Sequence, residues 1–196
     1  MEQARNLSDS SLIEQCLKLA EETGEVCKAV RKHEALSIDP ASSVGHVGHE
    51  LADVLIYVAA IANRADIDLT DTLRIEQNGD ALLEDSTPRT HSPSLAGLQR
   101  HVDTTGQLFS FTLIEQCLKL EGKIGKICTT VLARQVAATD STGTADSLGQ
   151  ALTGALICLV AIANRADIDL TNALRTKEEI NNGRVWTKPT MMSVPR

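Results

Sequence analysis

The chain contains two long segments that each occur twice. LIEQCLKL occurs at residues 12–19 and again at 113–120, and AIANRADIDLT occurs at 60–70 and again at 161–171. Both pairs have the same offset of 101 residues (12 to 113 and 60 to 161), so the copies align without an insertion. Self-similarity at a fixed offset is the signature of an internal duplication. Two copies are too few for a solenoid, and we therefore interpret the chain as an intrachain pseudo-dimer.

Apolar residues within each copy follow helical spacing. On the second predicted helix of the first copy they recur at intervals of three and four, as on a buried helix face, at Leu51, Val54, Leu55, Val58 and Ile61. We expect one helix from a serine cap among residues 8–11 to about Leu36, a second over 44–65, and a third over 72–83 capped by Thr70. No strand-like alternation occurs. The predicted fold class is all-α, with helical repeats packed around a four-helix-bundle core.

Polar and proline-rich segments mark the boundaries of the copies. We assign residues 1–84 to the first repeat, 85–93 to a linker, 94–186 to the second repeat and 187–196 to a flexible tail. The second repeat begins with an added short helix, SLAGLQRHV, at 94–102. The first repeat has no evident counterpart of this helix before LIEQ.

Four acids form two pairs on the first two predicted helices: Glu22 with Glu25, and Glu50 with Asp53. Residues three apart share one face of a helix, so two adjacent helices would direct four carboxylates into one space. At about 5 Å and an effective dielectric near 20, each pair of like charges repels by roughly 3 kcal/mol. A chain tolerates this repulsion only if the acids are protonated, splayed into water or bound to a cation. Ligands that are all oxygen favour Mg²⁺, with Mn²⁺ as a substitute, over zinc.

The second copy has lost all of these acids. Glu21, Glu22 and Glu25 align with Gly122, Lys123 and Lys126, and Glu50 and Asp53 align with Ala151 and Gly154. The second copy therefore cannot hold the same metal.

The end of each copy shows the reverse difference. The second copy carries Lys177, Asn181 and Arg184, which share one helical face if the helix extends that far, whereas the first copy has Glu76, Asp80 and Leu83. We infer one composite site per chain, in which the first repeat supplies the metal ligands and the second neutralises phosphate charge. The alternative is that the second copy drifted after duplication and its cations are solvated.

The acid pattern Glu21-Glu22-x-x-Glu25, followed by Glu50-x-x-Asp53, resembles the MazG-like all-α nucleotide pyrophosphohydrolases. That superfamily includes dimeric dUTPases and phosphoribosyl-ATP pyrophosphohydrolases. The flanking segments LKLAEETGEVCKAV and HELADVLIYVAAIANRADIDL are similar too, and the resemblance covers roughly residues 12–84 and 94–186. The chain departs from the family pattern in the second copy, which lacks the acids, and in the missing leading helix of the first.

The resemblance implies Mg²⁺-dependent cleavage of a nucleoside triphosphate between the α and β phosphates, giving a monophosphate and pyrophosphate. It implies metal ligation by Glu22, Glu25, Glu50 and Asp53, and phosphate contacts from Lys177, Asn181 and Arg184. It also suggests that Glu21 orients or deprotonates the attacking water, with Glu22 as a further catalytic group. Removal of unwanted or non-standard nucleotides is one expected role.

Two other functions stay open: a catalytically silent protein that senses nucleotide or metal, and a phosphoribosyl-ATP pyrophosphohydrolase. A zinc site built from His46, His49, Glu50 and Asp53 is also conceivable, although no third soft ligand is evident. Asn63 could contact a base or serve the fold, and Trp186 could cover the nucleotide or the bundle. Tyr57 fits the core better than base stacking. Lys18 is placed for an i,i+4 ion pair with Glu22.

The composition limits the partners and the compartment. A net charge of −7 without a long basic stretch disfavours nucleic acid, and the longest apolar run, VLIYVAAIA, has 9 residues, too few to span a membrane. The five cysteines form no CxxC pair, which favours buried thiols in a reducing compartment, the cytoplasm. The opening MEQARNLSDSS lacks the apolar core of a signal peptide. We expect a small-molecule nucleotide as the partner, and a homodimer is conceivable.

Overall fold

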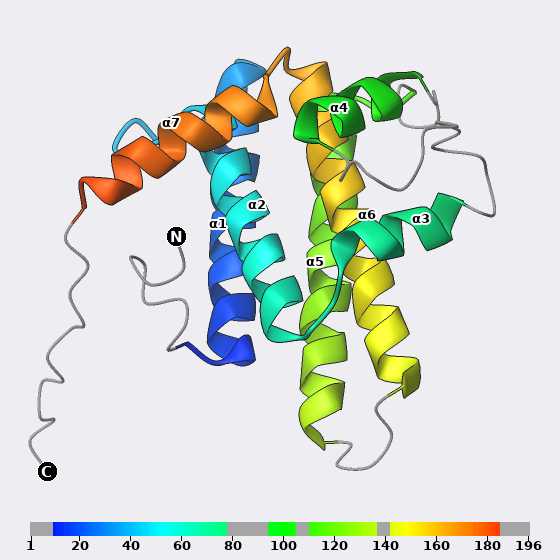
Figure 1. The fold of residues 1–196 in the computed structure, drawn as a ribbon. Helices are drawn as coiled ribbons and strands as arrows, with labels where there is room; N and C mark the ends of the chain where they lie inside the picture. Colours follow the sequence, from blue (N-terminus) through cyan, green and yellow to red (C-terminus); the bar gives the residue numbers. More distant parts are fainter. Residues whose placement is uncertain (1–9, 78–93, 105–109, 137–141, 185–196) are drawn as a thin grey trace, which may run out of the picture.

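Four long helices, packed as two antiparallel hairpins, form the centre of the protein (Figure 1). The computed structural model describes residues 10–77, 94–104, 110–136 and 142–184. All seven elements within these residues are α-helices, which confirms the all-α class. The central four are α1 (Leu12–His33), α2 (Val47–Arg64), α5 (Leu113–Val136) and α6 (Thr142–Arg165).

The first helix of each repeat begins at the same kind of cap. Ser11 precedes α1, and its hydroxyl accepts a hydrogen bond from the Glu14 N–H while the Glu14 carboxylate accepts one from the Ser11 N–H. Thr112 and Glu115 make the same reciprocal bonds at the start of α5. This capping box satisfies N–H groups that a helix start would otherwise leave unpaired. It confirms the expectation that a serine among residues 8–11 begins the first helix.

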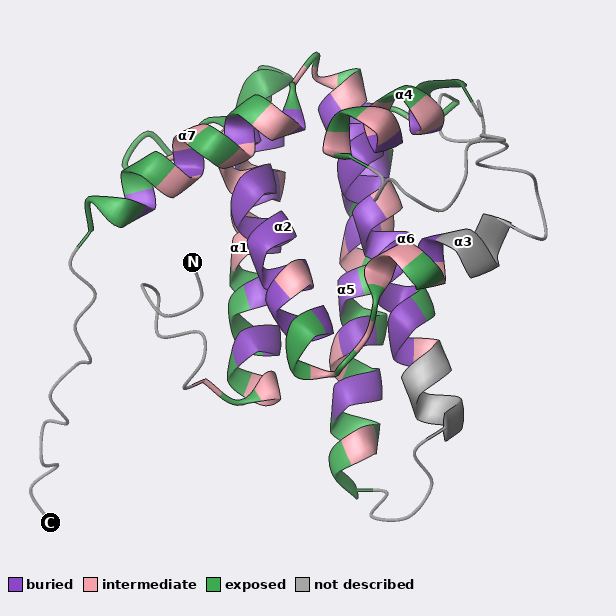
Figure 2. Cartoon of the chain, viewed as in Figure 1, coloured by how far each residue is buried: buried purple, intermediate pink, exposed green. Residues whose placement is uncertain are grey.

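The buried residues lie mainly along α2 and α6 (Figure 2). The core is aliphatic, and its fully buried side chains include Leu51, Ile61, Leu152 and Leu159. By length and composition alone, Ser147–Arg165 of α6 is apolar enough to cross a membrane. Counting uninterrupted apolar residues, as in the sequence analysis, did not reveal this segment. However, 78% of that window is buried inside the protein, as in the core helix of a soluble fold. Among the described helices α6 alone passes this test.

The third helix of each repeat packs on the other repeat. Helix α3 (Leu69–Gln77) lies against α6, and α7 (Leu170–Asn182) lies across α2 (Figure 1). Helix α1 also packs along α5, so the two repeats share one continuous core. This exchange carries the residues of α7 to the first repeat. The interpretation of the chain as a pseudo-dimer agrees with this arrangement but stays an interpretation.

The added helix α4 (Leu95–Thr104) is fastened to the α6–α7 turn by one glutamine. Gln99 Nε2 donates to Asn164 Oδ1 at 3.0 Å and to the Ile168 carbonyl at 2.8 Å. Gln99 Oε1 accepts from the Leu170 N–H at 3.0 Å, and Asn164 Nδ2 donates to the Gln99 carbonyl at 2.8 Å. Leu98 and Val102 of α4 are buried beside this network.

Several sequence expectations need correction. Helix α3 is capped by Asp68 rather than Thr70, because the Asp68 carboxylate accepts from the N–H groups of Thr70 and Asp71 at 2.7 and 3.2 Å. The predicted helix over 72–83 begins earlier, at Leu69, and its residues after Gln77 lie outside the described part. The linker at 85–93, the tail at 187–196 and Trp186 also lie outside it.

All five cysteines are free thiols, but only Cys16, Cys117 and Cys158 are fully buried. The other two are partly buried at the α1–α5 contact. Cys27 donates to a Glu121 carboxylate oxygen at 3.4 Å, and Cys128 lies 3.9 Å from the Cys16 carbonyl oxygen. The prediction that every cysteine is an inert core residue is therefore too simple.

Asn164 should matter more for stability than its counterpart in the first repeat. Asn164→Ala removes two hydrogen bonds to Gln99 and leaves half-buried polar groups unpaired, so we expect a loss of about 1–2 kcal/mol in the free energy of unfolding. Asn63, the aligned residue, is exposed, so Asn63→Ala should cost about 0.5 kcal/mol or less. Urea denaturation of both variants measures the difference, and equal losses would contradict the role given to Gln99.

Candidate metal and phosphate site

Three of the predicted acids meet where α1 packs against α2. Glu22 of α1 and Glu50 and Asp53 of α2 each offer a carboxylate oxygen, and these atoms lie within 4.8 Å of one another. Asp53 is buried, whereas Glu22 and Glu50 are half-buried. The i,i+3 spacing of Glu50 and Asp53 therefore places two carboxylates opposite Glu22, as the helical periodicity predicted.

Glu25 and Glu21 lie beside this cluster but hold other partners. Both oxygens of Glu25 accept from Lys28 Nζ at 3.0 Å. Glu21 is exposed, and its carboxylate accepts from Lys18 Nζ at 2.7 Å. The ion pair predicted between Lys18 and Glu22 is thus wrong: Lys18 pairs at i,i+3 with the exposed Glu21, because Glu22 is turned towards α2. This contact with Glu21 raises the pKa of Lys18.

Crowding of negative charge perturbs the acids. Burial, followed by the nearby carboxylates of Asp53, Glu21 and Glu50, raises the pKa of Glu22 to about 7. Burial also raises the pKa of Glu50, although Lys177 acts in the opposite direction. The charge of Glu25 contributes to the raised pKa of Glu50 as well, so Glu25 is within electrostatic reach. A site that keeps a glutamate near its protonation point at neutral pH favours any added cation.

The second repeat supplies a cation to this cluster. Lys177 Nζ of α7 lies 2.5 Å from Asp53 Oδ2, and the side chains of the two residues are only 8% and 9% exposed. Such a pair is tolerated away from water because each charge neutralises the other. The packing of α7 across α2 is what makes the contact, which joins residues 124 positions apart in sequence (53 to 177).

Asn181 lies one turn after Lys177 on the same helix and is 5% exposed. Neither its amide nitrogen nor its amide oxygen has a hydrogen-bond partner among the described residues. A buried amide left without partners is costly unless a ligand or water satisfies it. Arg184 lies beyond the end of α7, which stops at Asn182 and is capped by Gly183, so it is not on the helical face as expected. Its charge still lowers the pKa of Glu50, which places it near the acids.

One neighbour of the site, Gly45, escaped the sequence reasoning, and another, His49, was considered there only as a zinc ligand. A side chain at Gly45 would collide with the Glu50 carboxylate, so glycine leaves room for that group. His49 lies near Lys177 and Asp53, and burial together with Lys177 lowers the pKa of its imidazole. His46 accepts from the Gly48 N–H as the cap of α2. The metal-ligand cluster found among the described residues contains carboxylates without histidine, unlike the zinc alternative.

The three clustered acids fit a hard divalent cation. All of the donors are oxygens, they are close enough to share one ion, and their mutual repulsion is what a cation would relieve. Magnesium commonly binds through one or two carboxylates plus substrate phosphates, which matches a small acidic cluster open to further ligands. The orphaned amide of Asn181 indicates that a polar group is missing beside it.

The second repeat holds a lysine at the corresponding position. Lys123 aligns with Glu22 and Gly154 with Asp53, and Lys123 lies against Gly154 so closely that a Cβ there would come within 2.9 Å of Nζ. The Lys123 ammonium group therefore supplies positive charge in the second repeat where the first repeat has carboxylates.

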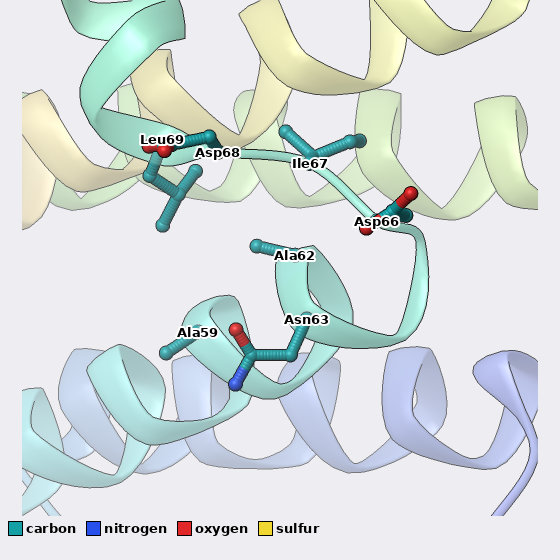
Figure 3. A pocket seen from close by; sticks show the side chains of 7 residues that line it. All are labelled: Ala59, Ala62, Asn63, Asp66, Ile67, Asp68 and Leu69. Atoms are coloured by element: carbon teal, nitrogen blue, oxygen red, sulfur yellow. The ribbon is translucent and has the colours of Figure 1, made fainter.

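Tyr57 and Asn63 were weighed as base contacts. Tyr57 is 9% exposed and belongs to the aliphatic core, as expected. Asn63 lies ten residues after Asp53 on α2, roughly 15 Å along the helix axis, and lines a separate pocket at the α2–α3 turn (Figure 3). The aligned residue in the second repeat, Asn164, accepts a hydrogen bond from Gln99 of α4 and so stabilises the packing of that helix.

Comparison with known proteins gives one family. Residues 11–76, roughly a third of the chain, match the model of the MazG nucleotide pyrophosphohydrolase domain. The matched segment contains all five acids of the motif and the whole of α1 and α2. Searches of curated proteins and of solved structures gave no match. The resemblance read from the acid motif is thereby confirmed for the first repeat.

The raised pKa of Glu22 predicts a pH-dependent stability. In the unfolded chain this group titrates near 4.5, whereas in the folded, metal-free protein it titrates at about 7. The folded state therefore binds the proton more tightly, and the contribution of Glu22 to stability falls as pH rises from about 4.5 to about 7.

Thermal unfolding of Glu22→Gln beside the unmodified protein tests this. The variant should gain in Tm relative to the unmodified protein as pH rises from 5 to 8, because glutamine carries no charge to desolvate. Added Mg²⁺ should remove this advantage at pH 8. A Tm difference that does not change with pH would contradict a crowded, desolvated Glu22.

Proposed function

We propose that this protein, whose residues 11–76 match the model of the MazG nucleotide pyrophosphohydrolase domain, is a Mg²⁺-dependent nucleoside triphosphate pyrophosphohydrolase. Water would attack the α phosphorus, the bond from that phosphorus to the α–β bridging oxygen would break, and the products would be a nucleoside monophosphate and pyrophosphate. Ribo- or deoxyribonucleotides could serve as substrate. The site would be composite, with one per chain.

The buried Lys177–Asp53 contact is the observation that most strongly supports this proposal. It brings a cation from the second repeat into direct contact with a proposed metal ligand of the first. Asn181, with its unsatisfied amide, lies one turn further along the same helix. A polyphosphate bound above the acids would supply the acceptor for its amide N–H groups and negative charge for Lys177 and Arg184.

In this mechanism Glu22, Glu50 and Asp53 would hold the metal, with Glu25 reaching it after releasing Lys28. When bound, magnesium supplies charge neutralisation for the phosphates. The protein groups hold the rest of the geometry. Glu21, at the rim, would orient the water and accept its proton on the carboxylate that now faces Lys18.

Lys177 would then have two roles. It neutralises the buried carboxylate of Asp53. With a cation held by the acids, Asp53 would no longer need the lysine, and Nζ would be available to the departing pyrophosphate. The freed ammonium would neutralise the charge that develops on the leaving group. Lys177 would thus be available to the substrate only when the acidic cluster holds a cation.

The location and assembly belong to the same proposal. A small-molecule nucleotide substrate and free thiols suit the cytoplasm. The continuous core already joins two repeats within one chain, and a homodimer of such chains would resemble a tetramer of single-repeat proteins. Nucleic acid and membranes would play no part.

The assay follows pyrophosphate release from a panel of NTPs and dNTPs with Mg²⁺. Glu50→Ala should abolish release, because it removes a ligand oxygen from the cluster. Phosphoribosyl-ATP in the same panel tests the related pyrophosphohydrolase activity. Nucleotide binding without turnover of any compound would reject the enzyme and favour the silent sensor.

The composite site has its own test in α7. Lys177→Ala should lower kcat/KM about 10-fold or more, equivalent to about 1.4 kcal/mol of transition-state stabilisation. Arg175→Ala is the matched control, because Arg175 is an exposed cation on the same helix and should leave the rate unchanged. Equal rates for the two variants would show that the second repeat does not contribute to the chemistry.

A further inference from the structure

Four of the five cysteines lie on α1 and α5, the helices through which the two repeats pack on each other. Cys16 and Cys27 are on α1, and Cys117 and Cys128 occupy the aligned positions of α5, each 101 residues later. Eleven residues separate the two cysteines of each helix (16 to 27 and 117 to 128), which is about three helical turns. The two cysteines of each helix therefore lie on the same face.

Contacts between α1 and α5 pair each cysteine with one of the other repeat. The two helices run antiparallel, so the start of each lies beside the end of the other (Figure 1). Cys128 Sγ lies 3.9 Å from the carbonyl oxygen of Cys16. At the opposite end, Cys27 Sγ lies 3.4 Å from a carboxylate oxygen of Glu121, which is one turn after Cys117 on α5. Each of the two pairs thus joins the first repeat to the second.

The thiols within each pair also interact with each other. Burial, followed by the charge of Cys128 and a hydrogen bond with its thiol, raises the pKa of Cys16 to about 12. Hydrogen bonding between Cys27 and Cys117 is the largest cause of the pKa shift of both thiols, upward at Cys27 and downward at Cys117. Both pairs are therefore made of neighbouring thiols rather than cysteines that merely share a helix face.

Helix packing of this kind suits a disulfide. Packed helices lie about 8–10 Å apart with Cα atoms about 2.3 Å from each axis, so Cα atoms that face each other directly are roughly 3.5–5.5 Å apart. Disulfides span Cα separations of about 4.4–6.8 Å. Thiols that already share a hydrogen bond across such a contact need only side-chain rotation to join.

We propose that Cys16–Cys128 and Cys27–Cys117 are two sites of reversible disulfide formation, which lock the repeats together in response to a hydroperoxide. Disulfides in the cytoplasm are usually transient and serve redox sensing, so this proposal agrees with free thiols in the resting protein. The inference does not rest on the proposed catalysis.

Each pair contains one partly buried thiol, Cys27 or Cys128, and one buried thiol, Cys117 or Cys16. The partly buried sulfur would attack the terminal oxygen of the hydroperoxide and break the O–O bond. This step gives a sulfenic acid and an alcohol, which takes the thiol proton. The buried sulfur would then attack the sulfenic sulfur, forming the S–S bond and releasing water with the second thiol proton. Two thiols are oxidised and one peroxide is reduced.

The fifth cysteine is an internal control. Cys158 is buried on α6, and it aligns with Tyr57, so the first repeat has no cysteine at that position. Burial raises the pKa of its thiol, although Lys123 and Lys119 act in the opposite direction. Since the other four cysteines are paired, one thiol of the five should stay reduced.

Hydrogen peroxide added to the reduced, full-length protein tests the proposal. Thiols counted after denaturation should fall from five to one, and dithiothreitol should restore all five. Peptide mapping without reductant should find the links Cys16–Cys128 and Cys27–Cys117. The oxidised protein should melt roughly 5–10 °C above the reduced protein, because cross-links restrict the unfolded chain.

Three matched controls sharpen the result. Cys158→Ser should keep both links, whereas Cys27→Ser should lose its own link and keep Cys16–Cys128. The same treatment of the protein unfolded in urea should give mixed pairings, because the packing of α1 on α5 selects the partners. The map of the unmodified protein decides the pairing even if a variant fails to fold.

Sulfinic or sulfonic acid at Cys27 and Cys128 without a link to the partner thiol would overturn the proposal. Links that include Cys158 or join two chains would also overturn it, as would the same pairings in folded and unfolded protein. Both links without a rise in Tm would show that they do not lock the repeats, and that outcome would contradict the proposal too.

Discussion

The contact between Lys177 and Asp53 is the interaction on which this account depends. It places an ammonium and a carboxylate together at 2.5 Å where both are almost fully buried. Breaking such a pair by removing one partner leaves an uncompensated buried charge, so neither residue can be lost alone without a large cost. The contact exists because the third helix of one repeat packs on the other repeat. It thereby ties the orientation of α7 to the acidic cluster formed by α1 and α2.

The two repeats have diverged in charge while keeping one backbone plan. In the first, carboxylate oxygens of Glu22, Glu50 and Asp53 lie within 4.8 Å of one another, so the cluster could hold a cation. In the second, Lys123 lies over Gly154, and the cation is part of the chain. The turns at Asp66 and Asp167 and the capping boxes at Ser11 and Thr112 are unchanged. The two repeats thus differ in charge at the positions of the acidic cluster, whereas these caps and turns are alike.

Periodicity and capping, both short-range properties, predicted the helices, the serine cap of α1 and the convergence of Glu22, Glu50 and Asp53. Local competition among charges was harder to predict. Lys18 forms an ion pair with Glu21 rather than Glu22, and Lys28 forms one with Glu25. Which acid each lysine meets depends on the face of α1 that packs against α2. The pairing of Lys177 with Asp53 depends on how two helices far apart in sequence cross, and a single sequence does not specify that crossing.

The central claim is that a cation bound by the first repeat and a lysine of the second repeat contact the same polyphosphate. A crystal structure with Mn²⁺ and an α,β-imido nucleoside triphosphate tests it most directly, since anomalous scattering locates the ion and the analogue resists cleavage. The account predicts manganese bound by Glu22, Glu50 and Asp53, with Lys177 Nζ moved from Asp53 to a phosphate oxygen. Manganese bound elsewhere, or a nucleotide held away from α7 while Lys177 stays on Asp53, would contradict it.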